Sequence, residues 1–194
     1  WVFLVCGLLS VVLVVPVRSA PPNLVANGGF LDGNATTITD WVRETNQATQ
    51  DFTNFPRAAP SLKSSFTDPY PKSFRYYQCV DARTITSGAE VGGSIATSNA
   101  SAANIEVTLH TDALCPGDPP VSVTLVAPIG NSNWYDLSAQ LGLPDGGWAY
   151  VKITVNQTID GEFVNFDDIY LQESDATSVL LVGPAAGRAP TGLI

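Results

Sequence analysis

Short runs of alternating apolar and polar residues recur along most of this chain. A period of two sends successive side chains to opposite faces of a strand, so Ile105, Val107 and Leu109 share one face. β-branched and aromatic residues, which favour strands, occupy many of the apolar positions. The runs with this pattern are 74–80, 105–110, 121–126, 150–155 and 162–171, with a shorter one at 62–66. We therefore predict strands at these six places.

Residues that favour turns separate the predicted strands. They include Ser87-Gly88, 115–120, 144–147 and Asp160-Gly161, and we also interpret Gly28-Gly29 and Gly92-Gly93 as turn glycines. The best helical candidate, Leu137–Leu141, would be one turn at most. Strand–helix alternation is absent, which argues against a parallel α/β sheet. Many short strands with turns between them predict an all-β fold, a jelly-roll β-sandwich of two antiparallel sheets.

The first 20 residues have the pattern of a signal peptide. An apolar run from Val2 to Val15 is followed by small residues, and cleavage after Ser19 suits a signal peptidase. A transmembrane anchor is the alternative, but the run is shorter than the roughly 20 residues that a spanning helix needs. We expect a signal peptide at 1–20, one sandwich domain at 21–173 and a poorly ordered tail at 174–194. No stable membrane span is expected after cleavage.

Cysteine usage agrees with export. Cys6 would leave with the signal peptide, so Cys79 and Cys115 remain in an oxidising compartment. We expect a disulfide between them, worth about 3–4 kcal/mol through its effect on the unfolded chain. A two-cysteine metal site is the less favoured alternative, because His110 is the only histidine and no CxxC spacing occurs.

Composition and charge exclude several function classes. The chain is 45% hydrophobic but only 14% charged, a balance common in secreted β-rich proteins, and its formal net charge is −9. Such a surface repels phosphate backbones, so nucleic acid is not expected as a partner. One histidine, no G-x-S-x-G motif and no distinguishable pair of carboxylates give catalysis little support. We predict that the protein is not an enzyme.

Two motifs at the ends of the expected domain carry a family resemblance. Asn23, Asn27, Gly28 and Phe30 precede Trp41, and the strand Phe163–Leu171 carries an acidic pair. Their order over residues 23–173 resembles the jelly-roll β-sandwiches with the galactose-binding-like fold, which include many carbohydrate-binding modules. The segment Gln78-Cys79-Val80 with its distant cysteine is similar to a group of bacterial secreted proteins with this sandwich.

The resemblance implies a structural calcium beside the first and last strands. Its ligands in the family are the acid after the opening Phe, backbone carbonyls and an Asp of the terminal pair, the hard oxygen donors that calcium requires. Here Leu31 follows Phe30, so Asp32 and Asp168 are the candidate ligands. The alternative is that these acids cap turns or accept backbone hydrogen bonds. Adjacent strand residues face opposite ways, so Asp167 and Asp168 are not both expected in the core.

Sugar-binding members of the family place aromatic rings beside amides and acids. The candidate ligand-binding residues are Tyr76, Tyr77, Phe55, Tyr70 and Trp148; Tyr76 and Tyr77 are neighbours, so only one of them should face outward. We predict a secreted, non-catalytic module that binds carbohydrate, a polysaccharide or glycan, or another extracellular or envelope polymer. A structural or adhesive envelope protein without a sugar site is the alternative, and a hydrolase is a weaker one. An exposed aromatic platform beside polar side chains would favour the first.

Overall fold

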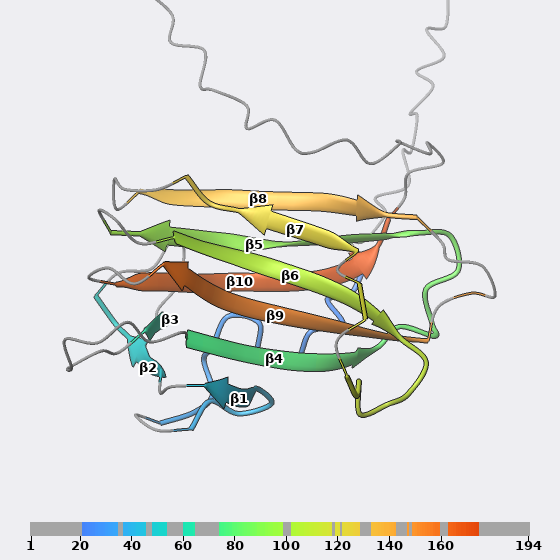
Figure 1. Cartoon of the computed structure of the whole chain (residues 1–194), viewed down its shortest axis with the longest axis horizontal. Helices are drawn as coiled ribbons and strands as arrows, with labels where there is room; N and C mark the ends of the chain where they lie inside the picture. The colour runs from blue at the N-terminus through green and yellow to red at the C-terminus, as the bar shows by residue number, and fades with distance from the viewer. Residues whose placement is uncertain are drawn as a thin grey trace, which may run out of the picture.

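The computed structural model describes a part of the chain that contains ten β-strands and no helix (Figure 1). That part comprises residues 21–34, 37–45, 48–53, 60–64, 74–98, 102–117, 119–120, 122–128, 133–142, 147, 149–159 and 163–174. The strands are β1 (Val42–Thr45), β2 (Ala48–Asp51), β3 (Ser61–Ser64), β4 (Phe74–Asp81), β5 (Ala89–Thr97), β6 (Ala102–His110), β7 (Val123–Val126), β8 (Trp134–Leu141), β9 (Tyr150–Ile159) and β10 (Val164–Glu173). Over these ranges, nothing resembles the long apolar helix that crosses a membrane. The predicted signal peptide and all of the predicted tail except Ser174 lie outside the described residues.

The strands form two five-stranded antiparallel sheets. The front sheet has the order β1-β4-β9-β6-β7, and the back sheet has the order β2-β3-β10-β5-β8. Figure 1 shows the two layers with their strands nearly aligned, β7 and β8 at one side and β1 and β2 at the other. The predicted all-β sandwich of two antiparallel sheets is confirmed.

All six predicted strands are present, as β3, β4, β6, β7, β9 and β10. The prediction missed β1, β2, β5 and β8. Two of its interpretations are wrong: Gly92-Gly93 lies inside β5 instead of a turn, and Leu137–Leu141 belongs to β8 instead of a helical turn. Glycines add nothing to an alternating pattern, and both strands are held by pairing with neighbours far away in sequence.

Alternating side chains fill the space between the sheets. On β4, Phe74, Tyr76 and Val80 are buried, and the Phe74 ring stacks on Tyr76 in its own strand and on Phe166 of the back sheet. The centroid distances are 5.1 and 6.0 Å. Because buried apolar area is the main favourable term in folding, this aromatic stack is a large part of what joins the two sheets.

The opening and closing sequence motifs lie side by side. The Leu24 amide donates to the Leu171 carbonyl oxygen at 2.8 Å, and the Ile169 amide donates to the Gly28 carbonyl oxygen at 2.9 Å. A Cβ added to Gly28 would lie 2.0 Å from the carbonyl oxygen of Ile169, so this close approach requires glycine. The N-terminal segment therefore pairs with the part of β10 that follows its two residues paired with β3, and its Phe30 is fully buried in the core.

A β-bulge interrupts β10 at the acidic pair. The pairing of β10 with β5 shifts register between Asp167 and Tyr170, and Asp168 has a φ of 50°. Phe166 and Ile169, on either side of the acids, are fully buried. Asp167 is opposite Ser94 in the ladder and is buried, whereas Asp168 is half-buried. The bulge thus lets two acids in succession avoid the apolar core.

Candidate functional site

The outer surface of the front sheet gathers charged and aromatic side chains from four strands. We call it the front face and define it by Glu44 of β1, Arg75 and Tyr77 of β4, Asn104 and Glu106 of β6, and Lys152 and Asn156 of β9. On β4, β6 and β9 these residues alternate with core residues, whereas Glu44 lies where the register of β1 shifts. The front face is therefore a product of strand periodicity, strand order and this irregularity of β1.

Ion pairs connect the charged residues of this face. Lys152 Nζ lies 2.8 Å from Glu44 Oε1, and Arg75 Nε lies 3.1 Å from Glu44 Oε2. Arg75 Nη2 also lies 3.5 Å from Glu106 Oε2. The pairs join three strands of the sheet and the edge strand β1 into one network, which holds the side chains in defined positions.

Amide groups extend the network on β6 and β9. The side-chain nitrogens of Asn104 and Asn156 each donate to Glu106 Oε1 at 3.4 Å, at the long end of the hydrogen-bond range. Carboxylate, guanidinium and amide groups thus lie within reach of one another. This combination supplies both acceptors and donors to an incoming polar ligand.

Tyr77 is the aromatic member of the front face. Its ring lies 4.3 Å from the ammonium of Lys152, a cation–π contact, and the residue is half-buried. Tyr76 is only 2% exposed and packs in the core, so it cannot present its ring to a ligand. The expectation that one of these two tyrosines faces outward is met by Tyr77, and Tyr76 as a ligand-binding residue is wrong.

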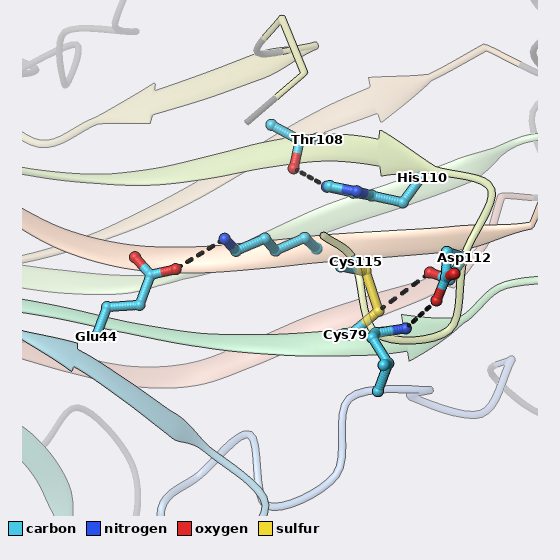
Figure 2. The surroundings of a disulfide bond; sticks show 8 residues. Glu44, Cys79, Thr108, His110, Asp112 and Cys115 are labelled. Atoms are coloured by element: carbon cyan, nitrogen blue, oxygen red, sulfur yellow. Dashed lines mark hydrogen bonds and ion pairs between the residues drawn. A yellow bond between two sulfur atoms is a disulfide. The ribbon is translucent and has the colours of Figure 1, made fainter. Parts of the chain in front are cut away.

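A disulfide ties a loop across one end of the front face (Figure 2). The predicted bond between Cys79 of β4 and Cys115 of the β6–β7 connection is present, with the two Cα atoms 5.9 Å apart. In Figure 2 the loop leaves β6 near His110 and passes in front of β9 to reach β4. The side chain of His110 is largely buried there and lies 2.9 Å from the Thr108 hydroxyl. The loop therefore forms a wall at this end of the face.

The back sheet has a polar hollow on its outer surface. It has a volume of about 130 Å³ and is lined by Gly93, Ser94, Asp136, Leu137, Ser138, Asp168 and Tyr170. We call this surface, together with Glu90 and Gly92 of β5, the back face. The Tyr170 hydroxyl donates to Glu90 at 2.7 Å, and burial together with this carboxylate raises the pKa of Tyr170 to about 12.

The calcium site at Asp32 and Asp168 stays a prediction, and both residues have other surroundings in the structure. Two carbonyl oxygens beside the opening motif, those of Phe30 and Leu31, already accept hydrogen bonds from the Gln50 side-chain nitrogen at 2.6 and 3.2 Å. The amide and carbonyl of Asp32 bond to the Asn27 side chain, and Asp168 lines the back-face hollow. No cluster of three acidic, His or Cys side chains able to hold a metal occurs in the described ranges.

Three predicted ligand-binding aromatics, Phe55, Tyr70 and Trp148, lie outside the described residues. Four charged members of the front face were not predicted as site residues, namely Glu44, Arg75, Glu106 and Lys152. For three of them, the alternation of residues along the predicted strands already indicated an outward position. Arg75 alternates with Phe74 and Tyr76, and Glu106 and Lys152 occupy outward positions of predicted strands.

No family profile matches the sequence, and no curated protein matches it. Several solved structures share its fold. TmCBM61 in complex with β-1,4-galactotriose has a TM-score of 0.59 at 17% identity, over 79% of this chain and 99% of that one. Family 16 carbohydrate-binding module 2 has a TM-score of 0.58 at 15% identity, over 78% and 100% of the two chains. The CBM22-1 xylan-binding domain of Paenibacillus barcinonensis Xyn10C has a TM-score of 0.52 at 12% identity, over 80% and 96%.

Enzymes also contain this fold as one part of a longer chain. The enzymatically active domain of bacteriophage CBA120 tailspike protein 4 matches with a TM-score of 0.56 at 14% identity, over 77% of this chain but 21% of its own. Most of the similar structures are carbohydrate-binding modules, which confirms the predicted resemblance at the level of the fold.

Proposed function

We propose that this protein is a secreted, non-catalytic module that binds carbohydrate on its front face. The observation that carries the proposal is the half-buried Tyr77 ring set within a network of charged and amide side chains. A sugar ring has an apolar C–H face, which an aromatic ring can cover, and hydroxyls that need hydrogen-bond partners. The front face offers both within one patch.

Pre-organisation supports a binding role for this network. Glu44 and Arg75 are each held by more than one partner, so their rotamers are restrained before any ligand arrives. A restrained site loses less side-chain entropy on binding than a mobile one. The disulfide-tied loop limits the motion of β4 and β6 at one end of the same face.

The arrangement of the acidic residues on the front face suits a binding role better than a hydrolytic one. A glycosidase needs one protonated carboxylic acid and a second carboxylate across the scissile bond. Glu44 and Glu106 instead lie on the same side of the network, where both contact the guanidinium of Arg75.

Secretion is part of the proposal. A disulfide persists in oxidising compartments, and the bond between Cys79 and Cys115 supports export of the chain. The apolar pattern of residues 1–20 is the second support.

The test is a binding screen of the full chain, exported so that its disulfide forms, against a panel of neutral and acidic polysaccharides by affinity electrophoresis and calorimetry. We expect at least one polysaccharide to bind and Tyr77→Ala to weaken it about tenfold, which corresponds to about 1.4 kcal/mol. The matched control is Phe52→Ala, because Phe52 is 64% exposed and follows β2 of the other sheet.

Two outcomes would contradict the proposal. If no polysaccharide binds, a structural or adhesive role without a sugar site takes its place. If Tyr77→Ala and Phe52→Ala weaken binding equally, the front face is not the site.

A further inference from the structure

We infer that the ligand of the front face is a neutral glycan, without uronate, sulfate or phosphate groups. This inference rests on the proposed function and narrows its substrate class. It follows from the ion pairs that the charged side chains of the front face make with one another. Both cations, Lys152 and Arg75, are already paired with carboxylates of neighbouring strands, at distances of 2.8 to 3.5 Å.

Lys152 is the less accessible of the two cations. Its side chain is 6% exposed, and its ammonium lies between Glu44 Oε1 at 2.8 Å and the Tyr77 ring at 4.3 Å. An anionic ligand would have to displace Glu44 from a largely buried partner to use this charge. Removing one partner from a buried pair is costly, because the other charge is left uncompensated.

Arg75 is more exposed and is also paired. Its side chain is 31% exposed, and its Nε and Nη2 atoms lie 3.1 and 3.5 Å from carboxylate oxygens of Glu44 and Glu106, although the buried Nε makes no hydrogen bond. Recognition of a uronate by arginine favours the two-pronged contact of a guanidinium with a carboxylate. At the Nε–Nη2 edge of Arg75, a uronate would have to compete with two protein carboxylates.

The carboxylates, in contrast, remain partly open to solvent. The side chains of Glu44 and Glu106 are 25% and 21% exposed, so an approaching anion meets negative oxygens beside the aromatic ring. The formal net charge of −9 adds repulsion at longer range. Neutral sugar hydroxyls can donate to these oxygens without breaking the ion pairs, so the network favours an uncharged ligand.

The test compares polysaccharides that differ mainly in charge. The pairs are mannan with polymannuronate, and methyl-esterified with demethylated polygalacturonate. Binding to the full chain is measured by calorimetry at about 50 and 500 mM NaCl. We expect any binding to favour the neutral member at least tenfold and to change less than twofold with salt.

The outcomes separate this inference from the proposed function. Tight, salt-sensitive binding of an acidic member, lost in Tyr77→Ala, would overturn the neutral-ligand inference and leave the sugar-binding front face intact. Binding of no polysaccharide would overturn both.

A charge variant provides a second, positive test. Glu44→Gln removes the acid shared by Lys152 and Arg75, so we expect affinity for the uronate polymers to rise about tenfold and to become salt-sensitive. The matched control is Glu90→Gln on the back face, which should leave uronate binding unchanged. Thermal unfolding confirms that each variant is folded. If Glu44→Gln gains no more uronate affinity than Glu90→Gln, the paired charges do not set the ligand class.

Discussion

The two outer faces of this sandwich are both polar, but they use their polar groups differently. The front face joins charged side chains across strands and leaves them 21–31% exposed, except for Lys152. The back face uses short hydroxyls, such as the Ser94 hydroxyl that donates to Asp136 at 2.6 Å, and lays Tyr170 against the glycine backbone of β5. Further along the same sheet, the side-chain nitrogen of the fully buried Asn165 donates to Asp51 Oδ2 at 3.1 Å and to Ser61 Oγ at 2.9 Å.

Under the proposed function, this difference separates a recognition surface from a structural one. Polar groups that are buried and satisfied specify strand pairing, because leaving any one of them without a partner is costly. Polar groups that are held in place but still accessible can meet a ligand. We therefore expect changes on the back face to affect stability alone, and changes on the front face to affect binding as well.

Removal of the disulfide should give the largest effect and should affect both properties. The bond closes a separation of 36 residues, so Cys79→Ser with Cys115→Ser should lower the free energy of unfolding by about 3–4 kcal/mol in urea titrations. Because the loop borders the front face, glycan affinity should also fall. Reducing agent should shift the wild type by a similar amount and leave the double variant unchanged. Equal stability of variant and wild type would show that other contacts hold the loop.

Gly92→Ala should disturb the back face alone. A Cβ at this position would lie 2.5 Å from the Leu137 carbonyl oxygen and 2.6 Å from the Tyr170 ring. Because overpacking of this kind forces backbone or ring to move, we expect a loss of about 1–3 kcal/mol in urea unfolding and unchanged glycan affinity. Gly142→Ala is the control, since a Cβ there meets nothing within 4 Å. Equal stability of the two variants would mean that Tyr170 is not held against β5.

Asp51 should make the back sheet sensitive to acid. Burial raises its pKa, but hydrogen bonds from the Thr53 hydroxyl and amide and from Asn165, with the charge of Lys63, outweigh this and hold the pKa at about 2. A lowered pKa stabilises the folded state above the unfolded value of 3.8, and this contribution is lost as the pH falls through about 2. It amounts to about 2 kcal/mol.

The acid limb of the stability curve measures this contribution. Asp51→Asn should lower stability by about 2 kcal/mol at pH 7 and by much less at pH 2, so its curve should be flatter between about pH 4 and 2. Front-face binding at pH 7 should not change. Parallel curves for the variant and the wild type would contradict the role of Asp51.

Much of the fold and part of the front face could be predicted from the sequence. Alternation placed Arg75 and Tyr77 on one surface of β4 and indicated that only one of two neighbouring tyrosines faces out. It could not predict that Lys152 meets Glu44, 108 positions earlier, because that contact depends on the order of strands in the sheet. It also missed β5, where two glycines hide the pattern, and β1, where no residue is buried and burial does not alternate. Non-local pairing decides these features, and a single sequence records it weakly.

Gln50 gives the smallest predicted effect and tests whether its amide, and not a calcium ion, occupies the carbonyl oxygens beside the opening motif. Its side-chain nitrogen donates to the carbonyl oxygens of Phe30 and Leu31. Gln50→Ala should therefore cost about 1 kcal/mol, seen as a fall of about 2–4 °C in Tm. In the wild type, Tm should be the same in chelator and in millimolar calcium, and an increase with calcium would contradict the assignment of these oxygens to Gln50.

Gln50→Glu sharpens this test, because it replaces the amide donor by a carboxylate beside two carbonyl oxygens. Three hard oxygen donors repel one another without a cation and together attract calcium. The variant should be less stable than the wild type in chelator and should regain stability in calcium, whereas Gln50→Ala should not respond. Calcium dependence in Gln50→Glu alone would show that the Gln50 amide lies where a calcium ion could otherwise bind.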